Sequence, residues 1–374
     1  MKILMIGPVY PYKGGIAHYT GLMCQALSKT HDVYMMSYKM QYPRLLHKKE
    51  QKDYDNSTFK IDQTDYQINT ANPINWICTV KKIKKWNPDL IIVQWWHPYF
   101  APCYRSICSG LKHYPIVFLC HNIFPHERFV LDRWLTKIVL NCGTSFIVHS
   151  GQEEKDLLSI RPDARVIRTV HPSYNAFKIQ DMPREQGREL LSISEKDKVI
   201  LFFGFVRKYK GLNYLIEALP EVCQELSNVK VLIVGEFDND KDQYVDLIKK
   251  LDVTGYIQIY DGYIPDKEVE KFFAASDVVV LPYESATQSG IVQISYGFEK
   301  PVIATAVGGL PEVVIDNKTG YIVPPCDHHA LAGKIIEFFK KNTAEQFQEG
   351  IQQEAYKYSW DRMVEAVEHI SQNS

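Results

Sequence analysis

Short apolar runs alternate with segments of helical periodicity along this chain, and the whole alternation occurs twice. In the first series, the expected strands are residues 2–6, 33–36, 90–94, 116–120 and 146–148. In the second series, they are residues 199–203, 231–234, 256–260, 278–281 and 302–304. Strands that are apolar throughout and separated by helices are typical of parallel sheets covered on both faces. Two such series predict an α/β protein with two doubly wound domains.

A polar segment between the two series marks the expected domain boundary, because it carries Pro183, Gly187 and many charges and has no apolar period. We expect an N-terminal domain at residues 1–180 and a C-terminal domain at residues 181–357. The last helix, at about 358–374, is expected to pack back onto the first domain. Ligands of parallel sheets bind outside the carboxyl ends of the strands, which predicts an active site in the cleft between the two sheets.

Composition and charge exclude several classes of protein. Hydrophobic residues make up 45% and charged residues 23% of the 374 residues, which excludes a disordered or collagen-like chain. The eight scattered cysteines favour a reduced, cytoplasmic location, and no apolar run is long enough to predict a membrane span. The net charge is −1, yet residues 1–180 are basic and residues 181–374 are acidic. A basic helix at 74–86 would permit peripheral contact with an anionic membrane, a charged surface helix being the alternative. Nucleic acid is not an expected partner, because no recognised motif accompanies the basic half.

Two polar segments directly follow predicted strands and open predicted helices. Gly14 and Gly15 would let a phosphate or sugar approach free backbone N–H groups, a plain flexible turn being the alternative. Their segment does not match the dinucleotide-binding pattern Gly-x-Gly-x-x-Gly. Arg207 and Lys210 follow the strand at 199–203, where their charges would neutralise a diphosphate. A solvated basic turn is the alternative there.

A third segment, residues 281–291, joins an apolar strand to a helix through small and hydroxylated residues. Ser289 and Gly290 lie at the expected helix N-terminus, and their backbone amides would point at a phosphate. Polar side chains in and just after this segment are expected to contact the bound ligand, and they are those of Glu284, Thr287, Gln288 and Gln293.

The order and spacing of these motifs resemble the nucleotide-sugar-dependent glycosyltransferases of the GT-B fold, specifically family 4 (group 1). The residues that carry the resemblance lie at 14–15, 204–219, 234–235, 274–278, 300–305, 308–312 and 320–325. The resemblance implies two Rossmann-like domains facing a central cleft. It also implies a retaining, metal-independent transfer of sugar from a nucleotide diphosphate sugar to a saccharide or lipid-linked acceptor. Cell-surface polysaccharide or glycolipid synthesis would be the setting, and the nucleotide sugar would be a co-substrate with no further cofactor.

The resemblance also assigns roles to individual residues. Tyr263 and Ile264 match the turn that contacts the nucleotide base. His121, which follows the strand at 116–120, matches the histidine beside the donor sugar and joins Arg207 and Lys210 as an expected catalytic residue. Two neighbours in the same loop, His126 and Glu127, are expected to face the acceptor.

The sequence departs from the family in two places. The family's Glu-x7-Glu pair falls on Ala286 and Ile294, which leaves Glu284 and Gln293 as the nearest substitutes. The family's arginine falls on Phe205, and the nearby Arg207 is the candidate for its charge. These departures keep two alternatives open, a sugar-nucleotide epimerase of the same fold and an inert nucleotide-sugar-binding module.

Two short patterns are also typical of metal sites. The triplet 238–240 has the Asp-x-Asp pattern of metal-dependent transferases, but it lies in a charged loop where solvated surface is the expected role. His121 with the histidine and glutamate at 126–127 lacks a third ligand at a suitable spacing. The sequence therefore predicts no metal.

Overall fold

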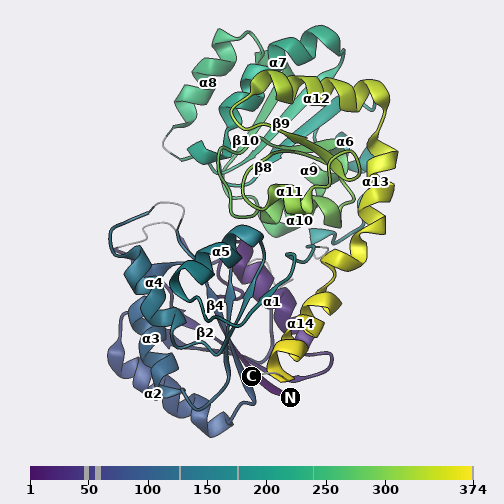
Figure 1. Ribbon diagram of the computed structural model, residues 1–374. Helices are drawn as coiled ribbons and strands as arrows, with labels where there is room; N and C mark the ends of the chain where they lie inside the picture. The colour runs from purple at the N-terminus through teal and green to yellow at the C-terminus, as the bar shows by residue number, and fades with distance from the viewer. Residues whose placement is uncertain (46–49, 55–59, 126–127, 175–176, 239, 373–374) are drawn as a thin grey trace. The chain divides into compact units, whose positions relative to one another are not determined.

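The computed structural model describes residues 1–45, 50–54, 60–125, 128–174, 177–238 and 240–372. The chain forms two compact units, Met1–Val170 together with Ser359–Ser374, and His171–Tyr358. The sequence-based division placed the first boundary at 180/181 and the return of the chain at about 358. Each unit contains one parallel sheet with helices packed against it (Figure 1).

The sheet of the N-terminal unit has seven strands in the order β3-β2-β1-β4-β5-β6-β7, and every pairing is parallel. Strand β1 pairs with β2 on one side and with β4 on the other, so the strand order reverses there. The carboxyl ends of β1 and β4 therefore flank the position where sheets of this type bind ligands. The strands are β1 (Lys2–Ile6), β2 (Asp32–Met40), β3 (Thr64–Asn69), β4 (Leu90–Trp95), β5 (Ile116–Cys120), β6 (Ser145–Val148) and β7 (Val166–Arg168).

The helices of this unit begin and end at recognisable signals. At the start of α2, the side chain of Asn72 accepts hydrogen bonds from the backbone of Ile74 and Asn75, and the helix ends at Asn87 in the left-handed conformation. Helix α2 packs on α3, α3 packs on α4, and the C-terminal helix α14 packs on α1 (Figure 1). The helices are α1 (Gly15–Leu27), α2 (Pro73–Trp86), α3 (Ala101–Gly110), α4 (Asp132–Leu140), α5 (Gly151–Ile160) and α14 (Trp360–Gln372).

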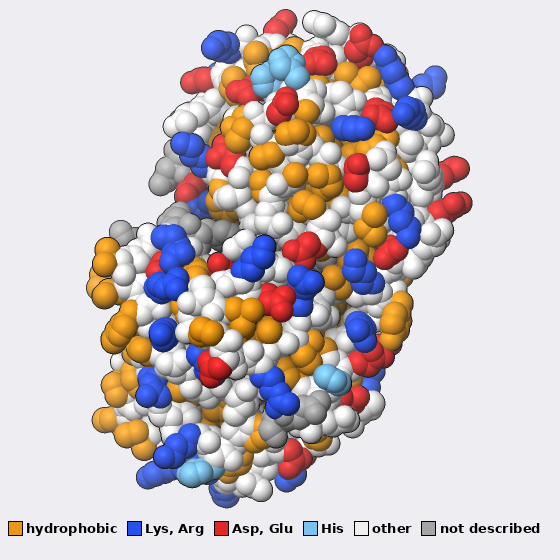
Figure 2. Space-filling view, viewed as in Figure 1, with side chains coloured by type: hydrophobic (Ala, Val, Ile, Leu, Met, Phe, Trp, Pro, Cys, Tyr) orange, Lys and Arg blue, Asp and Glu red, His pale blue; other side chains and the backbone are white. Residues whose placement is uncertain are grey.

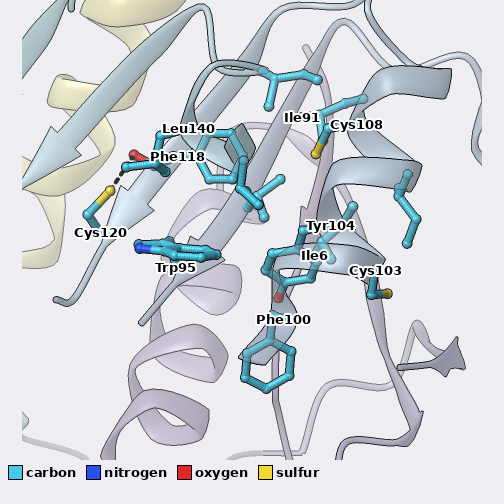
Figure 3. Packing of buried hydrophobic residues seen from close by; sticks show 14 of the residues in the cluster. Ile6, Ile91, Trp95, Phe100, Cys103, Tyr104, Cys108, Phe118, Cys120 and Leu140 are labelled. Atoms are coloured by element: carbon cyan, nitrogen blue, oxygen red, sulfur yellow. Dashed lines mark hydrogen bonds between the residues drawn. The ribbon is translucent and has the colours of Figure 1, made fainter. Parts of the chain in front are cut away.

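Aromatic side chains and cysteines fill the core between this sheet and α3 (Figure 3). The ring of Trp95 in β4 lies 6.4 Å from that of Tyr104 in α3, which in turn lies 5.6 Å from Phe100. Burial raises the pKa of the Cys108 and Cys120 thiols well above its usual value, so both act as small hydrophobic residues.

The C-terminal unit has a six-stranded parallel sheet in the order β10-β9-β8-β11-β12-β13, and its strand order reverses between β8 and β11. The strands are β8 (Lys198–Phe203), β9 (Val229–Gly235), β10 (Ile257–Asp261), β11 (Val278–Leu281), β12 (Val302–Thr305) and β13 (Gly320–Val323). The helices are α6 (Arg184–Leu190), α7 (Leu212–Glu225), α8 (Lys241–Lys250), α9 (Asp266–Ala275), α10 (Gly290–Gly297), α11 (Leu310–Val313), α12 (His328–Lys341) and α13 (Ala344–Gln353).

The two sheets confirm the predicted fold class of two doubly wound α/β domains. Strand β2 extends to Met40, beyond the strand expected at 33–36, and β3 lies where no strand was expected. Within the described part of the chain, no helix combines the length and apolar character needed to cross a bilayer.

Candidate functional site

The ammonium group of Lys210 lies near the carboxyl ends of β8 and β11. Gly204, directly after β8, has a φ of 105°, and a Cβ at this position would lie 3.1 Å from Lys210 Nζ and 3.3 Å from Ile291 Cδ1. The missing side chain at Gly204 therefore makes room for the lysine beside the first turn of α10. A short 3₁₀ turn, Lys208–Lys210, brings the lysine back toward the strand end.

Lys210 lies in surroundings that disfavour its charge. Its Nζ lies 5.6 Å from the centre of the Tyr283 ring, and no carboxylate among the described residues pairs with it. Burial and, to a smaller extent, the positive charge of Arg207 together lower the pKa of Lys210 to about 8. An anion that bound next to Lys210 would supply the negative partner that the protein itself does not provide.

The N-terminus of α10 adjoins this lysine through Tyr283. The Tyr283 hydroxyl lies 3.2 Å from Ser289 Oγ, and Ser289 caps α10 by accepting a hydrogen bond from the Ile291 backbone N–H. In the first turn of the helix, Gln293 is 1% exposed, and its Oε1 has no hydrogen-bond partner among the described residues. The structure thus places Lys210 beside the first turn of α10, the helix that carries Ser289, Gly290 and Gln293. A shared role of these residues in binding a donor stays a prediction.

Two hydrogen bonds from other parts of the unit fix the segment between β11 and α10. Glu284 accepts a hydrogen bond from the Tyr214 hydroxyl of α7 at 3.1 Å, so its carboxylate already has a partner. On the other side, Gly309 donates its backbone N–H to Thr287 O at 2.9 Å. Gln288 is half-buried in the same segment.

The other predicted donor-binding residues of this unit lie elsewhere. Arg207 forms an ion pair with Asp238, a member of the Asp-x-Asp triplet in the loop after β9. Tyr263 and Ile264 are half-buried in the loop between β10 and α9, and β9 separates β10 from β8. Their contact with a nucleotide base stays a prediction, as does the role of Arg207 against a diphosphate.

In the N-terminal unit, His121 follows β5, and its Nε2 lies 2.8 Å from Gln94 Oε1 of the neighbouring strand β4. The Tyr19 ring from α1 meets the His121 imidazole edge-on, with ring centroids 4.7 Å apart. His149, directly after β6, lies 6.1 Å from His121 between ring centroids. These residues form a polar and aromatic cluster at the carboxyl ends of β4, β5 and β6.

Sequence reasoning did not identify three members of this cluster, namely Tyr19, Gln94 and His149. A signal existed for His149, because it ends a strand and precedes Ser150 and Glu153, a Ser-x-x-Glu helix start. His126 and Glu127, the expected acceptor-side residues, lie outside the described residues.

Gly14 and Gly15 open α1 at the carboxyl end of β1. Gly14 caps the helix with a φ of 103°, a conformation that favours glycine. A Cβ added at either glycine would meet nothing within 4 Å, so neither glycine is required by a close neighbour in the fold.

Solved structures match this chain along its whole length. HepE from Anabaena, solved in complex with UDP, matches with a TM-score of 0.74 at 17% identity over 100% of both chains. Sucrose-phosphate synthase from Thermosynechococcus elongatus matches with a TM-score of 0.72 at 18% identity, covering 100% of this chain and 98% of the other. Together with the two parallel sheets, these similarities define the GT-B fold.

Two families match consecutive parts of the chain. Residues 13–176 match Glycosyltransferase Family 4, and residues 183–358 match Glycosyl transferases group 1. The chain therefore belongs to the GT-B glycosyltransferases of the group 1 and family 4 type.

Several curated relatives of this chain carry the names of glycosyltransferases. An uncharacterized glycosyltransferase of Methanocaldococcus jannaschii is 28% identical over 49% of this chain and 47% of its own length. The lipopolysaccharide 1,2-N-acetylglucosaminetransferase of Salmonella typhimurium is 24% identical over 72% of this chain and 70% of its own length. The chain spans about half the length of the first relatives that it matches, including a D-inositol 3-phosphate glycosyltransferase of Mycobacterium marinum.

Proposed function

We propose that this protein transfers a sugar from a nucleoside diphosphate sugar to a saccharide or lipid-linked acceptor, with retention of configuration and without a metal. The observation that carries the proposal is the Lys210 ammonium, which lies beside the N-terminus of α10 without a carboxylate partner among the described residues. A cation and a helix N-terminus together favour a phosphate group.

In the proposed reaction, the bond between the anomeric carbon and the diphosphate oxygen breaks, and negative charge develops on the leaving group. Lys210 and the amides at Ser289 and Gly290 would stabilise that charge, in the role that a metal has in other transferases. The acceptor oxygen forms the new bond to the anomeric carbon on the same face, and its proton passes to the leaving phosphate. His121 would orient the sugar, and Arg207 would join the site after release from Asp238.

The donor and the cellular setting are also proposed from the relatives. A UDP-glucose complex of HepE and the N-acetylglucosaminetransferase name of the Salmonella relative make UDP-glucose and UDP-N-acetylglucosamine the first donors to test. We place the reaction in cell-surface polysaccharide or glycolipid synthesis, in the cytoplasm and at the membrane surface. In support, hydrophobic side chains gather along the edge over α2, α3 and α4 (Figure 2), including the exposed Ile74, Ile77, Val130 and Trp134.

The proposal is tested by measuring the melting temperature of the protein with a panel of nucleotide sugars and then assaying transfer. A donor at 100 times its Kd should stabilise the native state by about 2.7 kcal/mol. Release of nucleoside diphosphate together with a glycosylated acceptor would establish a transferase. An altered sugar without release would instead establish an epimerase, and stabilisation without turnover would establish an inert binding module.

We expect the Gly15→Ala variant to fold normally and to lose transfer activity by about tenfold to a hundredfold, since misplacing a substrate by about 1 Å has effects of this size. An added Cβ at position 15 meets no atom of the described residues within 4 Å, so its effect should come from a ligand that approaches the backbone. Melting temperature and steady-state transfer rates check this expectation. Gly255→Ala, which also adds a Cβ in open space, is the matched control. Equal activity of the two variants would contradict a ligand contact at Gly15.

A further inference from the structure

A cavity of about 910 Å³ lies in the N-terminal unit, and its lining residues are not part of the candidate functional site. The end of β2 and the segment that follows it contribute to the lining, together with residues 50–52, Tyr54 and Tyr12. Its volume lies within the range of about 300–1,000 Å³ that is usual for small-molecule sites.

One wall of the cavity is built from the segment that leads into Gly14. Tyr12 pairs with Lys52 in an antiparallel bridge, and the backbone N–H of Lys13 donates to Gln51 O at 3.0 Å. The Asp53 backbone N–H also donates to Pro11 O at 2.7 Å. Residues 51–53 are therefore fixed to the loop before α1, which contributes Tyr12 to the lining.

The opposite part of the lining is fixed by the side chain of Gln51. Its amide accepts from the Tyr42 backbone N–H at 3.2 Å and donates to the Tyr42 carbonyl at 3.0 Å. The Tyr42 hydroxyl accepts a hydrogen bond from Trp96 Nε1 at 3.3 Å. Tyr42 and Tyr12 thus give the cavity two anchored aromatic walls.

The charge of the lining is positive and is not balanced by ion pairs. Lys39, Arg44 and Lys52 line the cavity, and none of them pairs with a carboxylate among the described residues. Lys52 Nζ instead lies 5.1 Å from the centre of the Tyr12 ring. The acidic residue in the lining, Glu50, accepts a hydrogen bond from the Lys52 backbone N–H at 3.2 Å.

We propose that this cavity binds an anionic group on the acceptor, a phosphate or a carboxylate attached to a sugar. The inference rests on the proposed transferase function and adds the chemical class of the acceptor. Three cationic side chains, Lys39, Arg44 and Lys52, line this one cavity. Charge-assisted hydrogen bonds to phosphate or carboxylate are the strong contacts that such groups make. The tyrosine rings would contact the sugar that carries the anion.

Calorimetric titration of the full chain with glucose 1-phosphate, glucuronic acid and glucose tests the inference. The titrations use the Lys210→Ala background, so that a phosphate cannot bind at the strand-end site. One or both anionic sugars should bind, and Lys52→Gln or Arg44→Gln should raise the Kd by about tenfold or more. Lys81→Gln, which removes an exposed charge on α2, is the matched control and should leave the Kd unchanged.

Each outcome has a defined meaning. Binding of glucose 1-phosphate alone would assign a phosphorylated acceptor, and binding of glucuronic acid alone would assign an acidic saccharide. Equal binding of glucose, no binding of any probe, or the same Kd in all cation variants would overturn the inference. The result is independent of the donor, because UDP-glucose binding to the unsubstituted protein is measured separately and tests the proposed function instead.

Discussion

Replacement of Lys210 by alanine is expected to lower the rate of sugar transfer by about a hundredfold or more, which is the usual loss when a preorganised charge contact to a leaving group is removed. The same change should leave the melting temperature unchanged or raise it. In the native state, burial and Arg207 lower the pKa of this ammonium to about 8. The charged form of Lys210 therefore lowers the stability of the native state. A large loss of activity without a loss of stability would indicate that Lys210 serves substrate binding and not folding.

The lowered pKa of Lys210 also predicts how stability and donor affinity depend on pH. Between about pH 8 and the usual lysine pKa, the unfolded chain carries a proton on Lys210 that the native state has lost, so stability rises with pH in this window. Donor affinity should change in the opposite direction and fall above about pH 8, because a diphosphate requires the charged form. Unfolding experiments at several pH values measure the change in stability, and donor titrations at the same pH values measure the change in affinity. The Lys210→Ala substitution should remove both pH dependences.

Lys208→Ala is the matched control, because Lys208 lies on the same 3₁₀ turn and is exposed. It should retain transfer close to that of the unsubstituted protein. Full turnover by the Lys210→Ala variant would remove this lysine from the proposed mechanism.

The sequence predicted the strands in the interior of both sheets and the edge strand β10, and it missed the edge strands β3, β7 and β13. Exposure does not account for the missed β13, which is buried at three of its four positions. Strand β4 is buried at every position, so its apolar run is continuous and easily recognised. Strand β3 lies at the edge of its sheet with Ile68 as its one buried residue, and its polar sequence therefore has no apolar pattern. The short edge strand β7 has no fully buried residue and was missed for the same reason.

Residues of the candidate site were predictable where the topology alone determines their position. Lys210 and Ser289 follow β8 and β11, which are neighbours at the switch point of the sheet, and Tyr283 connects them. The pairing of Arg207 with Asp238 was not predictable, because it depends on the path of the loop after β9.

We expect Gly308→Ala to destabilise the C-terminal unit by about 3 kcal/mol and to abolish donor binding, since positive φ and a backbone clash act together. Gly308 has a φ of 52°, and a Cβ there would lie 1.6 Å from the carbonyl oxygen of Ala286. Because that oxygen belongs to the backbone, the clash can be relieved only by moving the segment between β11 and α10. This segment carries Thr287 and leads to Ser289, so its displacement would also move the N-terminus of α10.

The Gly333→Ala substitution is the control for Gly308→Ala, because it adds the same methyl group at a position without a clash. Gly333 lies inside α12, and a Cβ there meets nothing within 4 Å, so the same substitution should stabilise the helix by about 0.5–1 kcal/mol. Thermal unfolding and UDP-glucose titration of both variants measure the contrast. If Gly308→Ala kept both the melting temperature and the donor affinity of Gly333→Ala, the close packing of residue 308 against Ala286 would not position the donor segment. If instead only stability fell while the donor still bound, Gly308 would support the fold without organising the site.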